Sequence, residues 1–146
     1  MGEFDLVPDI LEETGVKLLF RTIAVKPGKP TIFGKKGNKM VFGLPGNPVS
    51  SFFQFELLVK PLIYKVMNHK FEPSKIRLPM AVDYVRDKSF RKSWIPVQIT
   101  EKGELLPIEY HGSAHIYALD KAEGLISLPV GKNMLSKGEL VDVRQI

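Results

Sequence analysis

The residues best suited to chemistry lie between positions 43 and 51 (GLPGNPVSS), where an apolar strand runs through a tight loop into a helix predicted over residues 49 to 68. Gly46 would let a ligand approach the main chain, and Asn47 or one of the two serines could cap the helix. The first turn of such a helix carries unpaired N–H groups and a partial positive charge, which favour phosphate or a similar oxyanion. This segment therefore predicts one half of an anion site.

A predicted hairpin connects this segment to a second, basic loop at residues 26 to 30 (KPGKP). Its strands, residues 31 to 36 and 39 to 44, flank Gly37-Asn38, a pair that tolerates the positive φ angles of a two-residue turn. In this register Ile32 faces Gly43, Phe33 faces Val41 or Phe42, and Pro30 falls opposite Pro45. The two loops therefore share one end of the hairpin.

This placement brings two ammonium groups, those of Lys26 and Lys29, close to the helix N-terminus. Either loop alone could be a plain connection, because proline-glycine turns are common where strands end. Asn47 could equally be only a helix cap. Ser50 and Ser51 are interpreted as first-turn hydroxyls, since no His or Cys lies nearby to make either a nucleophile.

Composition sets broad limits on the class of protein. The chain has 146 residues, of which 44% are hydrophobic and 25% charged, as expected for one medium or two small globular domains. The longest apolar run, residues 49 to 67, is broken by charged residues and predicts a packed helix, so no membrane association is expected. No signal peptide is recognised, and the absence of cysteine excludes disulfides and thiolate metal sites. A cytoplasmic location is expected.

The net charge of +5 and pI near 9.4 favour an anionic partner. The basic residues are scattered without an aromatic-basic stripe, so nucleic acid is not expected. The densest basic group lies between Arg86 and Lys92, next to Trp94. It is interpreted as a solvated strand edge or turn.

The predicted elements change character near residue 70. Before it, a helix over residues 5 to 14, capped by Asp5 and ended by Gly15, precedes a strand over 16 to 25, the hairpin and the long helix, which Pro61 could bend. After it, the pattern predicts strands and one short helix, in a small barrel or sandwich. The strands cover residues 76–85, 93–100, 104–110, 124–129 and 139–144, and the helix covers 113–120.

The two loops, together with a tail that runs from Gly112-Ser113 through residues 122 to 125 and Leu128-Pro129 to residues 138 to 141, carry a family resemblance. The chain resembles the C-terminal part of the molybdopterin molybdenumtransferases, the MoeA proteins and the related gephyrin E domain. The resemblance implies that residues 1–70 form the C-terminal portion of a MogA-like, three-layer α/β domain that binds molybdopterin. It also implies that residues 71–146 form the small β-barrel or sandwich of the MoeA C-terminal domain, domain IV.

The activity implied by the resemblance is insertion of molybdenum from molybdate into adenylylated molybdopterin, with magnesium and release of AMP. Asp5 is the one acidic, catalytic position carried over, and it could equally be a helix cap. Ser113 could likewise be only a helix cap. The positions implied to bind substrate are Lys26, Gly28, Lys29, Pro30, Pro45, Gly46, Asn47, Pro48, Ser50 and Ser113.

Members of this family are longer, with a threonine-glycine-glycine loop and acidic metal ligands upstream of the matching region. Asp5 with Glu3, Glu12 and Glu13 forms no convincing metal cage, and the three histidines have no metal-site spacing, so the metal ligands stay unknown. A parallel α/β domain without its first strands would expose apolar surface. We therefore expect an isolated chain to be inactive and to associate with itself or with a separate N-terminal half, unless it is an excised fragment. The alternative is a non-catalytic protein-binding or scaffold module.

Overall fold

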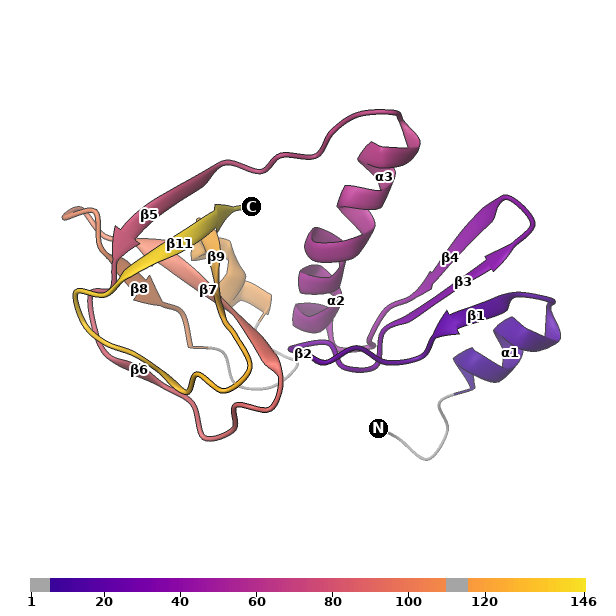
Figure 1. The fold of residues 1–146 in the computed structure, drawn as a ribbon, viewed down its shortest axis with the longest axis horizontal. Coiled ribbons are helices and arrows are strands. Elements are labelled where there is room, and N and C mark those ends of the chain that lie inside the picture. The colour runs from indigo at the N-terminus through magenta and orange to yellow at the C-terminus, as the bar shows by residue number, and fades with distance from the viewer. Residues whose placement is uncertain (1–5, 110–115) are drawn as a thin grey trace.

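The computed structural model describes residues 6–109 and 116–146, which form an N-terminal α/β part and a C-terminal β part (Figure 1). The prediction of an α/β region followed by an all-β region is confirmed. The N-terminal part contains α1 (Val7–Glu13), β1 (Lys17–Phe20), β2 (Val25–Lys26), β3 (Ile32–Lys36), β4 (Lys39–Gly43), α2 (Pro48–Gln54), the π-helical turn η1 (Phe55–Val59) and α3 (Lys60–Val66).

The C-terminal part is built from short strands. It contains β5 (Lys75–Pro79), β6 (Tyr84–Val85), β7 (Lys92–Ile99), β8 (Leu105–Pro107), the 3-10 helix η2 (Ile116–Lys121), β9 (Gly124–Leu128), β10 (Met134–Leu135) and β11 (Leu140–Gln145). Four of the five predicted strands correspond to β7, β8, β9 and β11. The predicted strand 76–85 is wrong as one element, because β5 and β6 belong to different sheets. The predicted short helix matches η2, and its first residues lie outside the described range.

The hairpin of β3 and β4 has the predicted register. Ile32 pairs with Gly43 and Phe33 pairs with Phe42, and Gly37 adopts a φ of 57° in the turn. Strand β1 pairs with β3, which gives a sheet of order β1-β3-β4 with antiparallel neighbours. The parallel arrangement expected for this region is therefore not the arrangement of its described strands.

The predicted strand over residues 16 to 25 is divided. Its register with β3 becomes irregular between Leu18 and Phe20, and the chain then leaves the hairpin sheet. Strand β2 instead runs parallel to β7, with Val25 opposite Lys92 and Lys26 opposite Ser93. It is the edge strand of a sheet of order β2-β7-β9-β11-β5, to which β8 adds through β7. The basic loop therefore starts from the sheet of the C-terminal part.

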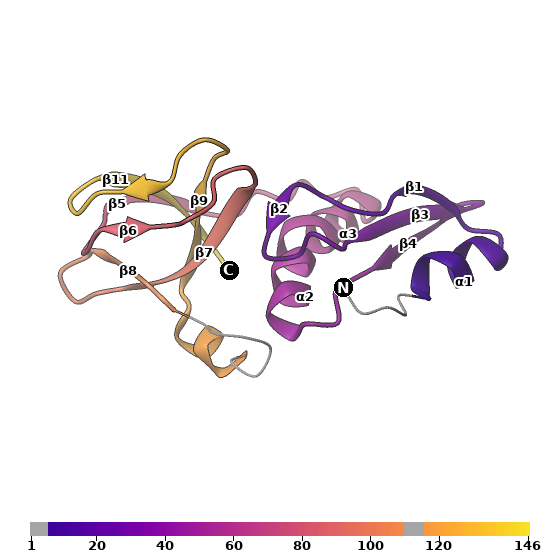
Figure 2. The same cartoon turned by 90° about the horizontal axis from the view of Figure 1, so that it is seen from below.

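The long helix forms nearly as predicted, from Pro48 to Val66, but it contains the wider turn η1, which ends at Val59, two residues before Pro61. Pro61 has no N–H to donate to the carbonyl four residues earlier, and a π-helical turn absorbs such a break in the ladder. Both views place this helix between the hairpin and the C-terminal part (Figures 1 and 2).

The first helix, α1, begins with Leu6 at the N-cap position and has no side-chain capping bond from that residue. Asp5, the predicted cap, lies outside the described residues. Gly15, with a φ of 83°, follows its C-terminal end as predicted. No residue of α1 is buried.

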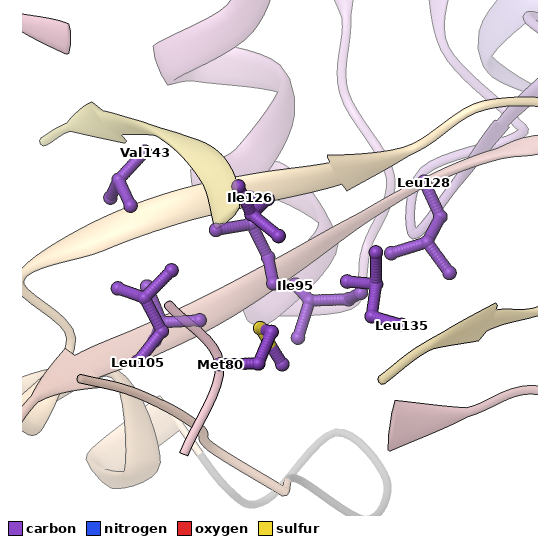
Figure 3. Close-up of a cluster of buried hydrophobic side chains, with 9 residues drawn as sticks. Met80, Ile95, Leu105, Ile126, Leu128, Leu135 and Val143 are labelled. Atoms are coloured by element: carbon purple, nitrogen blue, oxygen red, sulfur yellow. The ribbon is translucent and has the colours of Figure 1, made fainter. Parts of the chain in front are cut away.

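Two clusters of buried side chains hold the molecule together. The larger lies inside the C-terminal part and includes Met80, Ile95, Ile126 and Leu128 (Figure 3). The smaller joins the two parts, because Val49 and Phe53 of α2 pack with Leu125 of β9. Helix α2, which follows the predicted anion loop, is thus fixed against the C-terminal sheet.

Candidate anion-binding site

The basic loop of residues 26 to 30 is held in place by hydrogen bonds to its main chain. Gln54 Nε2 of α2 donates to the carbonyl oxygen of Pro27 at 2.8 Å, and the buried Thr31 Oγ1 donates to that of Gly28 at 2.7 Å. Gly28 has a φ of 102°, and a Cβ built on it would lie 2.1 Å from Gln54 Nε2. Glycine is therefore required here by the fold, whether or not the loop binds a ligand.

The second loop leads into α2 through a capped turn. Asn47 Oδ1 accepts the N–H of Ser50 at 3.1 Å, and Pro48 occupies the first helical position, where its missing N–H costs nothing. Ser51 Oγ donates to the carbonyl oxygen of Pro45. Asn47 is thus the residue that caps the helix, as one of the sequence interpretations held.

This cap changes the electrostatic description of the site. Pro48 has no N–H and that of Ser50 is used by Asn47, so Val49 has the remaining N–H of the first three helical positions. The helix terminus therefore offers fewer donors than the sequence suggested. Lys26 and Lys29 are both exposed, and their ammonium groups are the main source of positive charge at this end of the hairpin.

Gly46, unlike Gly28, is not required by its φ angle or by close neighbours. It does not have a positive φ, and nothing in the described residues lies within 4 Å of a Cβ built on it. Neither backbone conformation nor packing in residues 6–109 and 116–146 requires a glycine here. Gly46 is exposed, so its main chain is open to solvent.

The sequence interpretation missed the role of Arg86, which is buried rather than part of a solvated edge. Its Nη1 donates to the carbonyl oxygen of Arg91 at 2.7 Å and to Ser93 Oγ at 2.5 Å, and its Nε and Nη2 donate to the carbonyls of Lys132 and Pro129. No local pattern could have revealed this, because two of the acceptors lie 43 and 46 residues away along the chain.

Arg91 is a further cation beside the basic loop. Its Nη1 donates to the carbonyl oxygen of Val25 at 3.4 Å, and the N–H of Lys92 donates to that of Ala24 at 3.1 Å. The sequence signal for this neighbourhood is the basic run between Arg86 and Lys92, for which a solvated edge or turn is predicted. Only the pairing of β2 with β7 brings Arg91 to Lys26.

Lys26 also lines a cavity of ≈ 270 Å³, to which residues 93–95 in the first half of β7 contribute. Arg86, Tyr84, Trp94 and Glu109 contribute to its wall. Burial raises the pKa of Tyr84, against the opposing influence of the Arg86 charge. The phenol is therefore neutral near pH 7, and the positive groups of this wall are Lys26 and Arg86.

The two loops also contain prolines that were predicted to bind substrate. Pro30 is half-buried and Pro45 is buried, so both shape the loops more than they expose surface. Asp5 and Ser113 lie outside the described residues. In residues 6–109 and 116–146 no group of three or more His, Cys, Asp or Glu side chains could hold a metal ion, so these residues do not fit a magnesium site. Within the same residues, no helix is long and apolar enough to cross a membrane.

The fold and the two loops define a class of protein in which a lysine-rich loop and a capped helix, placed together by a hairpin, are fixed against a small β domain. Residues 1–65 match the family profile described as a probable molybdopterin binding domain, and residues 77–146 match that of the MoeA C-terminal region, domain IV. The chain belongs to the MoeA family.

Relatives and solved structures agree with these profiles. The chain is 30% identical to a molybdopterin molybdenumtransferase of Synechococcus elongatus and 34% identical to one of Haemophilus influenzae, over 100% and 98% of its length and 36% of each relative. A MoeA protein of Pyrococcus horikoshii matches 97% of the chain with a TM-score of 0.83 and 32% identity, over 34% of that structure. A Pyrococcus furiosus molybdenum cofactor biosynthesis protein matches 99% with a TM-score of 0.79 and 26% identity, over 55%. The chain thus spans about a third of the length of these curated relatives.

Proposed function

We propose that this chain supplies the pterin-phosphate and molybdate-binding loops for insertion of molybdenum from molybdate into adenylylated molybdopterin, with release of AMP. The observation that carries the proposal is the meeting of two loops at one end of the β3–β4 hairpin. Gln54 links them directly, since it belongs to α2 and donates to the carbonyl oxygen of Pro27. Both substrates are oxyanions, and this end of the hairpin combines exposed lysines with a helix N-terminus.

Each residue has a distinct role in this proposal. Lys26 and Lys29 neutralise phosphate or molybdate charge, with Arg91 as a third cation beside Lys26. Gly46 keeps the main chain open to the ligand, while Asn47 and Pro48 orient the first helical turn. The hydroxyl of Ser50, for which no hydrogen bond is found in the described residues, donates to an oxyanion. Gly28 and Pro30 shape the loop rather than touch the substrate.

A titration with molybdate, followed by a second with molybdopterin, tests this site. We expect Lys26→Ala and Lys29→Ala each to weaken binding by about tenfold, the effect of losing one hydrogen bond to a charged group. Gly46→Ala should weaken binding without changing the melting temperature, because the added methyl group meets open space in the described structure. Lys102→Ala, in an exposed turn, is the matched control. Equal affinity in all five proteins would remove these residues from the site.

Turnover is proposed to need groups that the described residues do not contain. We propose a homo-oligomer, or association with a separate polypeptide that supplies the N-terminal half, since the chain matches about a third of its relatives. Incubation with adenylylated molybdopterin and molybdate tests this directly. AMP release by the chain alone, at the rate of a full-length relative, would contradict it.

A second candidate function, a non-catalytic protein-binding module, is favoured by one observation. An apolar groove between β4 and α3 is lined by Met40, Phe42, Ile63 and Met67, and Met67 is 64% exposed. Size-exclusion chromatography with light scattering tests both candidates for association. A stable monomer whose melting temperature is independent of concentration would count against self-association through this groove.

A further inference from the structure

A second cationic cavity lies between the long helix and the C-terminal sheet. Its volume is ≈ 450 Å³, within the range of small-molecule sites, and Pro61, Phe71, Trp94 and Leu125 are among its lining residues. Phe71 belongs to the connection that crosses from α3 to β5 (Figure 1). Lys26 and Lys29 are not among the lining residues, so this cavity is distinct from the loops of the proposed substrate site.

Three cations line this cavity: Lys75 at the start of β5, Lys92 at the start of β7, and Arg144 of β11. Asp142 is the carboxylate in the wall, and it lies 3.5 Å from Arg77 in a largely exposed ion pair. Glu56, the acidic group that acts on Arg144, is paired with Lys60 at 3.0 Å. Both carboxylates therefore have ion-pair partners other than the three cations that line the cavity.

Aromatic rings hold two of these cations in position. Lys92 Nζ lies 4.6 Å from the centroid of Trp94, and the guanidinium carbon of Arg144 lies 5.3 Å from that of Phe71. Such contacts restrict long side chains that would otherwise be mobile in water. The charged ends are thus arranged at the cavity before any ligand arrives, which lowers the entropic cost of binding.

Two arginines of the C-terminal part, the buried Arg86 and the half-buried Arg144, differ in how many of their donors the fold uses. Arg86 uses its Nε, Nη1 and Nη2 in bonds to main-chain carbonyls and Ser93, so it has no donor to offer. Arg144 donates through Nη2 to the carbonyl oxygen of Glu56, and its buried Nε has no partner in the described residues. All the hydrogen-bond donors of Arg86 are used within the fold, whereas Arg144 has a donor that no described residue uses.

We propose that this cavity binds a small molecule that carries phosphate, with a charge of at least two. Three cations in the lining of one cavity match a polyanion better than a single carboxylate, and guanidinium and ammonium donors match phosphate oxygens. The ligand would contact both the connection after α3 and the C-terminal sheet, so binding would also fasten these two parts together. This inference does not depend on the proposed molybdate function.

Trp94 provides a reporter, because it is the single tryptophan of the chain and it lines the cavity under Lys92. We would titrate the full chain with inorganic diphosphate at constant ionic strength and follow its fluorescence. We expect a saturable change that chloride does not produce. Lys75→Ala, at an exposed position, should weaken diphosphate binding by about tenfold.

Trp94 also lines the cavity that contains Lys26, so variants must separate the two. Lys26→Ala removes diphosphate bound at the proposed substrate loops, so the part of the signal that Lys75→Ala weakens should persist in Lys26→Ala. Lys102→Ala, in an exposed turn, should leave the diphosphate affinity within twofold of the unchanged protein. The proposal is overturned if no saturable signal is found, or if Lys26→Ala abolishes the signal while Lys75→Ala preserves it. The second result would assign diphosphate to the proposed substrate loops instead.

Discussion

The C-terminal part of the chain buries a continuous apolar core, whereas the N-terminal part leaves much of its apolar surface in contact with solvent. Met80, Leu105 and Leu128 are fully buried among the strands of the C-terminal sheets. In contrast, α1 and α3 contain no buried residue, and Val66 of α3 is 63% exposed. The N-terminal elements are amphipathic in sequence, but only part of their apolar faces is buried against other elements.

This difference shows how the candidate site is supported. The loops that carry Lys26 and Asn47 are in the N-terminal part, but they are anchored where that part meets the C-terminal sheet, through β2 and through Phe53 of α2. Elements remote from this contact, such as α1, add little buried area. We therefore expect local stability to fall from the sheet outward to the hairpin and α1.

The strongest test of the comparison uses two leucine-to-alanine changes. Leu128→Ala in β9, where the side chain is fully buried, should lower the free energy of unfolding by about 2–5 kcal/mol. Leu19→Ala in β1, where the side chain is 53% exposed, should change it by about 0.5 kcal/mol or less. Urea unfolding followed by circular dichroism measures both. Similar losses in the two variants would mean that the N-terminal part is packed as tightly as the C-terminal part.

A pair of glycines sharpens the comparison within the site. Gly28→Ala should cost about 2 kcal/mol, because the alanine would need a positive φ and its Cβ would overlap Gln54. Gly46→Ala should leave the free energy of unfolding nearly unchanged. Differential scanning fluorimetry would rank the two variants. A larger loss for Gly46→Ala would place an unrecognised structural contact at that position.

The helix cap should have a smaller effect. Asn47→Ala removes the acceptor for the N–H of Ser50 and should cost about 1 kcal/mol. Asn47→Asp keeps an oxygen at this position and should retain most of the stability. If both variants were as stable as the unchanged protein, the cap would contribute nothing to stability, and ligand contact would be the remaining role of Asn47.

The smallest expected effect concerns pH and the C-terminal part. A hydrogen bond from Lys132 lowers the pKa of Glu139, so the folded state binds this proton less readily than the unfolded state. The stability from this group is therefore present above its ordinary pKa and is lost as the pH falls through the lower, folded value. The stability difference between the unchanged protein and Glu139→Gln should shrink as the solution is acidified below about pH 4.5. A difference that grows on acidification would reverse the assigned sign.

Local patterns were sufficient for the elements whose signals are short-range. The Gly37-Asn38 turn determined the hairpin and its register, and short runs of strand-forming residues between turns identified β7, β8, β9 and β11. The same patterns failed where the structure of a segment depends on its pairing with a distant segment of the chain. Val25 and Lys26 continue an apolar strand in sequence, yet they leave it to pair with β7, more than 60 residues later. Arg86 resembles any surface arginine until its distant carbonyl acceptors are known.

By itself, the amino-acid sequence determined the two loops, the hairpin that joins them and the family to which the chain belongs, because glycine, proline and asparagine act on their own backbone and immediate neighbours. The tertiary structure decided which groups remain available for binding. All donors of Arg86 are used in bonds within the fold, whereas the Nε of Arg144 has no partner in the described residues. Availability depends on contacts between segments far apart in the chain, and those contacts exist only once the two parts have packed together.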